Sequence, residues 1–200
     1  MSRPDSSELG ERPDAAAALR RQARGLTLDR TVALVGLMGA GKTTIGRRLA
    51  AALGVRFLDA DDEIVRAAGM SVEDIFATQG ELEFRRGERR VIARLLEEPP
   101  HILATGGGAF IDPTTRALMR ERAITIWLRA PLDVLMKRVA RRDNRPLLKE
   151  DDPRAVMERL MQVRYPIYAE ADLTIESANG PHNNAVAEVI DALKRRPAAP

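Results

Sequence analysis

The chain has 200 residues, of which 44% are hydrophobic and only 4% aromatic, so it can bury a core but offers few rings for stacking nucleic-acid bases. Its 32 basic and 29 acidic side chains give a mixed surface with a formal net charge of +3, and this small basic excess argues only for anionic small ligands. The chain has no cysteine, which excludes disulfides and thiolate metal sites, and no apolar run of transmembrane length. We therefore expect one monomeric domain in the cytoplasm, without a nucleic-acid or membrane partner.

Residues 1–30 are predicted to form a poorly ordered N-terminal extension. Residues 1–13 are rich in Ser, Pro, Gly and charged side chains, whereas residues 14–24 have the composition of a short Ala-rich helix capped by Asp14. Acids are frequent in this stretch, which argues against an organelle transit peptide, because such peptides are poor in acids.

Residues 31–53 carry the most specific motif of the chain. A β-branched and apolar run over residues 31–35 predicts a strand, and residues 42–53 have the spacing of a helix. Between them, GLMGAGKT matches the phosphate-binding pattern G-x-x-x-x-G-K-[ST] in its strand–loop–helix setting. Glycines let backbone N–H groups curl around an anion, Lys42 supplies charge for the β- and γ-phosphates, and Thr43 supplies a hydroxyl for Mg²⁺. The sequence therefore predicts a nucleoside-triphosphate site.

Strands and helices alternate along the rest of the chain. Further strands are predicted over residues 55–58, 101–104, 123–128 and 173–176. Further helices are predicted over residues 61–68, 72–78, 81–96, 113–119, 131–141, 153–169 and 185–195. The alternation predicts a three-layer α/β fold, with a five-stranded parallel sheet between helices and a ligand site beyond the carboxyl ends of the strands.

Two acids follow the second predicted strand. Asp59 and Asp61 are two residues apart, so an extended backbone would place both carboxylates on one side of the chain. Phosphoryl transfer needs one acid near the metal and another that orients the attacking hydroxyl or accepts its proton. The same residues also suit the N-terminus of the following helix as caps, and the sequence alone leaves both interpretations open.

Glycines and arginines supply further candidates. Residues 106–108 are three glycines after a strand, which either allow close approach of the backbone to a ligand or form a flexible turn. Arg85 and Arg86 lie within a predicted helix, where such charges are mostly solvated. His101 and His182 are isolated in the sequence, and we interpret them as structural or exposed side chains rather than ligands.

Another arginine-rich stretch occupies the last third of the chain. Arg142 and Arg145 lie in a charged, proline-containing loop over residues 142–152, and Arg164 follows in the next predicted helix. A loop of this kind that closes over bound phosphates would neutralise charge and exclude water, although most charge runs are simply solvated.

Six motifs in collinear order resemble the shikimate kinase family. They are GLMGAGKTTIGRRLA, LDADD, IFATQGELEFRR, ATGGGA, NRPLL and VRYPIYAEAD, and the likeness extends over about residues 31–190. The resemblance implies the fold of nucleoside-monophosphate kinases and ATP-dependent phosphorylation of the 3-hydroxyl of shikimate, in the route to chorismate and the aromatic amino acids. It also implies Mg²⁺, a kinase domain over residues 31–196, a substrate-binding segment over about residues 61–96 and a mobile lid over about residues 140–153.

The resemblance assigns roles residue by residue. ATP would contact Gly36, Gly39, Ala40, Gly41, Lys42, Thr43, Thr44 and Arg145. Shikimate would contact Asp61, Phe76, Phe84, Arg85, Gly106, Gly107, Gly108 and Arg164. The metal would be held by Thr43 and Asp59, and the catalytic residues would be Lys42, Asp61 and Arg145. The family often has an arginine in its adenine-contacting segment, which residues 176–185 lack, so that contact is left unassigned.

Two other functions remain open at this point. Another small-molecule kinase of the same fold, such as a gluconate kinase, would not need carboxylate-directed arginines at Arg85 and Arg164. A non-catalytic nucleotide-binding module would keep the phosphate loop alone, whereas Asp59, Asp61 and Arg145 are also present here. The sequence therefore favours an enzyme, with shikimate as its substrate.

Overall fold

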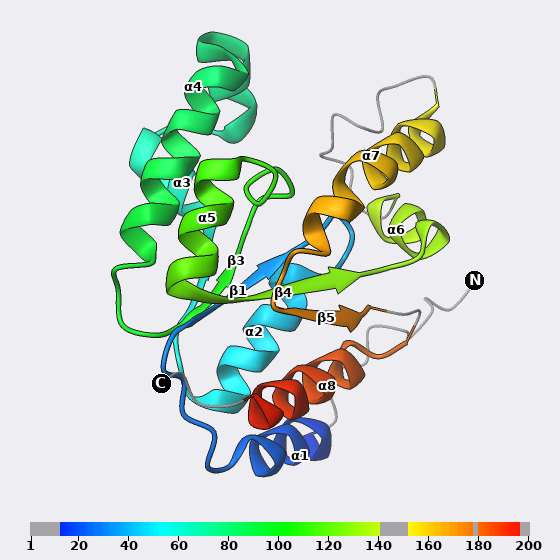
Figure 1. Cartoon of the computed structure of the whole chain (residues 1–200). Helices are drawn as coiled ribbons and strands as arrows, with labels where there is room; N and C mark the ends of the chain where they lie inside the picture. Colours follow the sequence, from blue (N-terminus) through cyan, green and yellow to red (C-terminus); the bar gives the residue numbers. More distant parts are fainter. Residues whose placement is uncertain (1–12, 141–151, 178–179, 197–200) are drawn as a thin grey trace, which may run out of the picture.

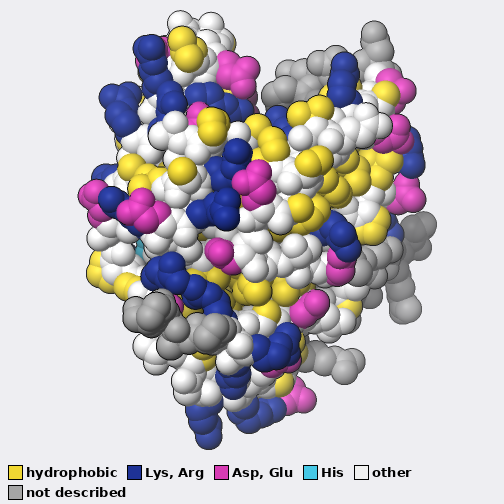
Figure 2. Space-filling model, in the orientation of Figure 1, with side chains coloured by type: hydrophobic (Ala, Val, Ile, Leu, Met, Phe, Trp, Pro, Cys, Tyr) yellow, Lys and Arg dark blue, Asp and Glu magenta, His cyan; other side chains and the backbone are white. Residues whose placement is uncertain are grey.

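The structure, a computed structural model, describes residues 13–140, 152–177 and 180–196 (Figure 1). The strands are β1 (Thr31–Val35), β2 (Phe57–Asp59), β3 (Ile102–Ala104), β4 (Ala123–Arg129) and β5 (Leu173–Glu176). The helices are α1 (Pro13–Ala23), α2 (Lys42–Leu53), α3 (Ala60–Ala68), α4 (Val72–Leu95), α5 (Pro113–Arg122), α6 (Leu132–Val139), α7 (Pro153–Tyr168) and α8 (His182–Arg195). Within these ranges no helix is long and apolar enough to cross a membrane. Basic and acidic side chains are interspersed over the face shown in Figure 2, as the balanced charge of the sequence suggests.

All five strands form one parallel sheet in the order β2-β3-β1-β4-β5. The central strand β1 is buried along its whole length, because a parallel strand in this position is covered on both faces. Helices α1, α2 and α8 lie together on one side of the sheet, while α4, α5 and α7 lie on the other (Figure 1). The predicted three-layer α/β fold with a five-stranded parallel sheet is therefore confirmed.

Three predicted functional loops lie next to one another at the carboxyl-terminal end of the sheet. The chain leaves β1 for β2 at one edge, returns to β3 beside β1, and then continues on the other side of β1 with β4. In open sheets of this kind the ligand crevice lies outside the carboxyl ends of the strands, at the point where the order reverses. The phosphate loop follows β1, Asp59 ends β2 and the three glycines follow β3, so all of them meet at this point.

Most predicted elements are present, and the largest differences concern α4 and α8. The elements β1, α2 and β5 have the predicted bounds. The two helices predicted over residues 72–78 and 81–96 form one element, α4, within which Gly80 keeps a non-helical conformation at φ 81° and ψ 171°. Helix α8 begins three residues earlier than predicted, because Pro181 already holds the backbone at φ −55° before it.

The prediction of a poorly ordered extension does not hold for residues 13–30. Helix α1 packs against α2 and α8, and its Leu19 is buried there. Gln22 Nε2 donates hydrogen bonds to the Ala187 carbonyl at 3.0 Å and to Asp191 Oδ1 at 2.8 Å, both on α8. These tertiary contacts offset the cost of ordering a short helix, which its own propensity would not. Asp14, predicted as the cap, lies within the first turn, and residues 1–12 lie outside the described part of the chain.

A buried polar contact joins the amino ends of β1 and β3. His101 is fully buried, and its Nδ1 lies 3.2 Å from Thr31 Oγ1 and 3.0 Å from the Pro99 carbonyl oxygen. Since a carbonyl only accepts, the neutral ring donates from Nδ1. Burial lowers the pKa of His101, because a charged imidazolium would lose its hydration there. The interpretation of His101 as a structural residue is confirmed.

We predict that acidification weakens the fold through His101. Its pKa in the folded state lies below the ordinary value of 6.5, so the unfolded chain binds more protons as the pH falls below that value. His101→Gln removes this titration and should flatten the pH dependence of the unfolding free energy by up to about 1.4 kcal/mol per pH unit. Urea unfolding between about pH 7 and pH 5 measures both slopes. A residual slope is expected from His182, whose pKa is also lowered by burial, and an unchanged slope would contradict the prediction.

Candidate active site

The phosphate loop between β1 and α2 depends on three glycines at positive φ. Gly36, Gly39 and Gly41 have φ angles of 135°, 81° and 94°, which residues with a Cβ rarely adopt. Gly36 is also packed so tightly that an added Cβ would lie 2.8 Å from the Leu128 carbonyl oxygen. A backbone of this kind lets successive N–H groups turn toward an anion, which is the chemistry that the motif predicts.

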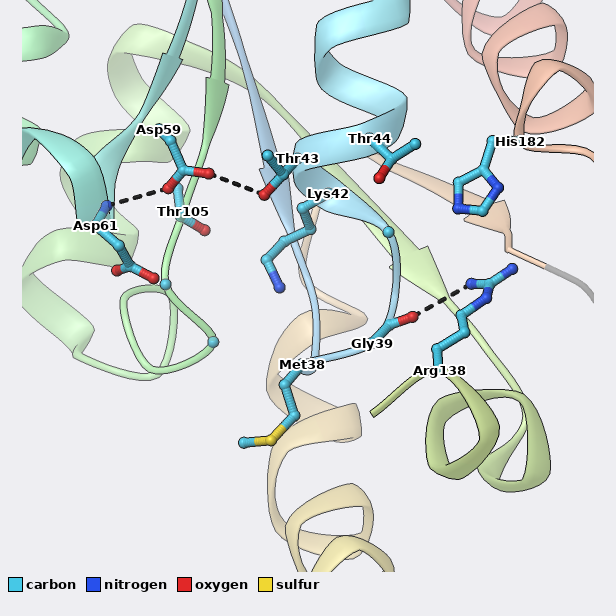
Figure 3. A pocket seen from close by; sticks show the side chains of 13 residues that line it. Met38, Gly39, Lys42, Thr43, Thr44, Asp59, Asp61, Thr105, Arg138 and His182 are labelled. Carbon is cyan, nitrogen blue, oxygen red and sulfur yellow. Dashed lines mark hydrogen bonds between the residues drawn. The ribbon is translucent and has the colours of Figure 1, made fainter. Parts of the chain in front are cut away.

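Lys42, Thr43 and Asp59 lie close together beside this loop (Figure 3). Lys42 Nζ donates to the carbonyls of Gly36 at 2.7 Å and Leu37 at 3.0 Å, so its ammonium group lies against the loop. Thr43 Oγ1 donates to Asp59 Oδ2 at 2.8 Å. This hydrogen bond joins the start of α2 to the end of β2 and places a hydroxyl and a carboxylate together beside the phosphate loop.

Asp59 caps helix α3 and also lies at the candidate site. Its Oδ1 accepts from the Asp61 N–H at 3.2 Å, which makes it the N-cap of α3, while its other oxygen bonds Thr43. Asp59 and Asp61 also line the same cavity. Helix capping and a place in the candidate site therefore coexist in this acid.

A cavity of 310 Å³ brings the predicted groups together. Its lining consists of Met38, Gly39, Gly41, Lys42, Thr43, Thr44, Asp59, Asp61, Thr105, Gly106, Gly107, Arg138 and His182. In Figure 3 the two aspartates lie on one side of Lys42, and Arg138 and His182 lie on the other. Residues 106–108 are hereafter called the glycine loop. Its first two residues, Gly106 and Gly107, thus share one cavity with phosphate-loop residues and the acid pair, whereas Gly108, Arg85 and Arg164 do not line it. Ala40 is fully buried and does not line the cavity, and its N–H donates to the Leu37 carbonyl at 3.2 Å.

Two side chains of the cavity wall, Arg138 and His182, were not predicted as site residues. Arg138 Nη1 donates to the Gly39 carbonyl at 3.3 Å and to Ser177 Oγ at 2.8 Å. Burial lowers the pKa of Arg138, and burial together with the charge of Arg138 lowers the pKa of His182. The interpretation of His182 as structural or exposed missed its position, because only the packing of α8 beside the phosphate loop brings it to the cavity.

The glycine loop lies against charged side chains of α3 and α4. Unlike the glycines of the phosphate loop, none of its three residues has a positive φ. An added Cβ at Gly106 would lie 2.9 Å from both Asp61 Oδ1 and Glu88 Oε1. One at Gly108 would lie 2.5 Å from Arg85 Nη2. Glycine at these two positions therefore leaves room for the ends of these side chains, and it is not needed there for a special conformation.

Arg85 and Glu88 form an ion pair beside the glycine loop. Arg85 Nη1 donates to Glu88 Oε2 at 2.7 Å, and its Nη2 donates to Glu81 Oε1 at 3.3 Å. Burial alone would lower the pKa of Arg85, but the hydrogen bonds and charges of Glu88 and Glu81 outweigh that effect and raise it. Arg85 is therefore not the solvated surface charge that its position in a helix suggests, whereas Arg86 is exposed.

Glu88 is a buried acid that sequence analysis missed. Its side chain is 2% exposed, and burial raises its pKa against the opposing hydrogen bond from Arg85. Its Oε1, which faces Gly106, is buried without a hydrogen-bond partner in the described part of the chain. The available signal was its spacing, because Glu88 follows the buried Phe84 by four residues and so lies on the same helix face.

Arg164 and Arg145 are the other two arginines that were predicted as site residues, and the structure describes only Arg164. Arg164 of α7 donates from Nη1 to the Gly107 carbonyl at 3.3 Å, so it lies at the glycine loop on the side of α7. The structure thus brings Arg85 and Arg164 to the same loop from two helices. Arg145, the predicted lid arginine, lies outside the described residues.

The structure does not bring Phe76 and Phe84 into the cavity. Phe84 is buried beside Arg85, whose Cζ lies 5.2 Å from the ring centroid, and it lines a separate groove between α3 and α4. Phe76 is 38% exposed, and its ring centroid lies 4.6 Å from that of Phe84. Phe84 therefore packs against Arg85 and Phe76 packs against Phe84 in this structure, and the predicted contact of both rings with a substrate stays a prediction.

The oxygen donors of the cavity fit a magnesium ion. Mg²⁺ prefers hard oxygen ligands and keeps several waters, so it is usually held by one or two protein groups together with phosphate oxygens. The Thr43 hydroxyl and the Asp59 carboxylate, in direct contact beside the phosphate loop, are groups of this kind. No cluster of three or more His, Cys, Asp or Glu suited to a metal occurs in the described ranges.

Fold and site together define an ATP-dependent P-loop phosphotransferase, with a phosphate loop and an acid pair at the carboxyl edge of a parallel sheet. The family model of shikimate kinase matches residues 38–194. Shikimate kinases from Caulobacter vibrioides and Paramagnetospirillum magneticum are 54% and 55% identical to this chain over 166 residues, which cover 83% of this chain and 83% and 85% of theirs. The chain belongs to the shikimate kinase family.

Solved structures agree with this assignment. A shikimate kinase from Acinetobacter baumannii in complex with shikimate matches 90% of this chain and 97% of its own, with a TM-score of 0.80 and 37% identity. A gluconokinase from Sinorhizobium meliloti matches 83% of this chain and 92% of its own, with a TM-score of 0.56 and 17% identity. The second likeness concerns the fold alone.

We predict that a methyl group at Gly108 displaces Arg85 from Glu88. The added Cβ meets the end of a flexible side chain, so the fold should survive, but Glu88 would lose its donor. Gly108→Ala should therefore lower the free energy of unfolding by about 1–3 kcal/mol. Gly87→Ala is the matched control, because that helical glycine has open space around its Cβ position and should gain about 0.5–1 kcal/mol. Urea unfolding compares the two, and equal stability would contradict the prediction.

Proposed function

We propose that this protein transfers the γ-phosphoryl group of ATP to the 3-hydroxyl of shikimate, giving shikimate 3-phosphate and ADP in the route to chorismate and the aromatic amino acids. The observation that carries the proposal is the position of the glycine loop. An added Cβ at Gly107 would lie 3.6 Å from the Gly36 carbonyl, so this loop packs on the phosphate loop, while Asp61, Arg85 and Arg164 surround it. A triphosphate and a small acceptor would thus bind side by side.

The phosphate loop would hold the donor. In this proposal the glycine-rich backbone and Thr44 bind the phosphates, and Lys42 moves its ammonium from the loop carbonyls to the β- and γ-phosphate oxygens. Thr43 would hold Mg²⁺, with Asp59 binding it through water, and the ion would neutralise charge on the phosphates. Arg145 would add charge from the lid. Arg138 and His182 line the cavity on the far side of Lys42 from the acids, and the nucleoside would bind on that side.

Asp61 would act on the acceptor hydroxyl. The hydroxyl oxygen forms a bond to the γ-phosphorus while the bond from that phosphorus to the β–γ bridging oxygen breaks, and ADP leaves with the bridging oxygen. The hydroxyl proton passes to the Asp61 carboxylate, which lines the cavity beside the phosphate loop. Asp61 thus orients the attacking oxygen and accepts its proton.

Two arginines would select an acceptor that carries a carboxylate. Arg85 and Arg164 reach the glycine loop from α4 and α7, and a planar guanidinium pairs well with a carboxylate in a bidentate manner. The glycine loop would contact the acceptor hydroxyls through its backbone, and Phe76 and Phe84 would wall the ring. A neutral polyol would offer these two guanidinium groups no carboxylate, so it would lose the charge-assisted hydrogen bonds that an anionic acceptor makes, each worth about 1.5–3 kcal/mol.

We further propose the organisation that the family resemblance implies. Residues 31–196 would form the kinase domain, residues 61–96 its substrate-binding segment and residues 140–153 its lid, in a monomer that works in the cytoplasm. The position of Asp61 in α3 and of Arg85 in α4 supports the substrate-binding segment.

We predict that ADP release from ATP and Mg²⁺ is stimulated by shikimate and not by gluconate. Quinate, which shares the carboxylate and several hydroxyls of shikimate, tests how closely the acceptor is recognised. A coupled assay of ADP release with each compound measures this directly. Stimulation by gluconate alone would overturn the choice of acceptor, and ATP binding without stimulated release would favour a non-catalytic nucleotide-binding module.

We predict different kinetic defects for Asp61→Asn and Arg85→Ala. The first removes the proton acceptor and should lower kcat by about 10²–10⁴-fold. The second removes a charged donor to the acceptor carboxylate and should raise KM for shikimate by about 10–100-fold. Arg86→Ala is the control, because that exposed neighbour pairs with Glu83 and should change neither constant. Near-normal kcat in Asp61→Asn would remove Asp61 from the mechanism.

A further inference from the structure

One carbonyl of the glycine loop receives two donors from α7. The Tyr168 hydroxyl donates to the Gly107 carbonyl oxygen, and Arg164 Nη1 donates to the same oxygen at 3.3 Å. The two side chains are four residues apart on α7 and so lie on the same helix face. Tyr168 is 1% exposed, so its hydroxyl is shielded from water and donates to this carbonyl instead.

Tyr168 serves here as a hydrogen-bond donor and not as a proton carrier. Burial raises the pKa of its phenol to about 12, although the charge of Arg164 opposes this shift. The hydroxyl therefore stays protonated at neutral pH. What it contributes to the site is a fixed donor at the Gly107 oxygen.

The Tyr168 hydroxyl restrains the glycine loop, a segment with high intrinsic backbone flexibility. Three consecutive glycines have more accessible backbone conformations than any other tripeptide of L-residues. A carbonyl oxygen with two donors uses both of its lone pairs, which fixes the plane of the peptide between Gly107 and Gly108. Because this peptide is trans and planar, the Gly108 N–H must point away from the carbonyl and hence away from α7.

The restrained peptide lies where the two halves of the site meet. An added Cβ at Gly107 would lie 3.6 Å from the Gly36 carbonyl oxygen and 3.8 Å from the Met38 nitrogen, both in the phosphate loop. The glycines on either side of Gly107 approach Asp61 and Arg85. The orientation of this one peptide therefore sets how the acceptor side of the cavity faces the phosphate side.

We propose that Tyr168 is a positioning residue for the acceptor substrate: with Arg164 it orients the peptide after Gly107, so that the glycine loop presents its N–H groups to an acceptor beside the phosphate loop. For the identity of the acceptor, the inference rests on the proposed function. Tyr168 does not line the cavity, so it acts through Gly107 and makes no contact with the substrate itself.

Tyr165 provides a matched control on the same helix. Its hydroxyl donates to the Ala130 carbonyl at 2.7 Å, between β4 and α6 and outside the glycine loop. Both tyrosine rings pack against Trp127, with centroid distances of 4.9 Å for Tyr165 and 6.0 Å for Tyr168. Tyr168→Phe and Tyr165→Phe each remove one hydrogen bond from a tyrosine hydroxyl to a backbone carbonyl and keep the ring. They therefore differ mainly in which carbonyl loses its donor.

The first measurement compares steady-state kinetics of the two variants with the wild type. Tyr168→Phe should raise KM for shikimate by about tenfold, because a loop that must be ordered on binding uses part of the binding free energy. Its kcat and its KM for ATP should stay within about twofold, since Tyr168 lies outside the cavity and the glycine loop is already ordered once the acceptor has bound. Tyr165→Phe should leave all three constants within the same limits. Thermal unfolding of both variants checks that each is folded.

The second measurement needs no substrate. Hydrogen exchange followed by mass spectrometry on the protein alone reports the opening of the peptides that cover residues 105–110. Tyr168→Phe should increase exchange there by about tenfold and leave β1 and β4 unchanged, whereas Tyr165→Phe should not affect residues 105–110. This readout stands even if shikimate fails to stimulate the wild type, a result that would overturn the proposed function and not the restraint of the loop.

Three results would overturn the inference. Exchange at residues 105–110 that is the same in Tyr168→Phe and wild type would mean that the hydroxyl does not restrain the loop. Faster exchange with an unchanged KM for shikimate would mean that the restraint has no part in acceptor binding. An equal rise of KM in both variants would assign the effect to the general packing of α7.

Discussion

The close approach of the glycine loop to buried charge is the constraint on which the site depends. A buried carboxylate such as Glu88 is tolerated because Arg85 donates to it, and the removal of either partner would leave an uncompensated charge. The backbone after β3 approaches this ion pair closely, because Gly106 and Gly108 have no Cβ. The same contact joins α4 to the segment after β3 and holds the Arg85 guanidinium beside Gly108.

A separate set of contacts holds the phosphate loop. The glycine loop touches both this loop and the charged side chains of α3 and α4. Gly36 must be glycine for its φ and for the space beside Leu128, and Thr43 joins the phosphate loop to Asp59 at the end of β2. The glycine loop lies between the two sets, since β3 is the neighbour of β1. A phosphoryl group would therefore have to travel only across the contact between two adjacent loops.

Local pattern was sufficient to predict some parts of this arrangement and not others. The bounds of β1 and α2 follow from an apolar run, a glycine motif and a glycine C-cap, which are encoded within a few residues. The position of His182 in the cavity wall follows from the packing of α8, and the order of α1 follows from contacts with α2 and α8. No local signal encodes such contacts between distant segments. Glu88 is an intermediate case, because its helical spacing from Phe84 predicts burial but not its partner.

The class of fold, the phosphate loop and the resemblance to the shikimate kinase family could all be predicted from the sequence, because they depend on short-range periodicity and on residue types at fixed spacing. Which side chains meet at the glycine loop could be learned from the three-dimensional structure alone. Asp61, Arg85, Glu88, Arg164 and Tyr168 come from three helices, α3, α4 and α7. Their meeting depends on where parallel strands place those helices in space, and on the room that two missing Cβ atoms leave between them.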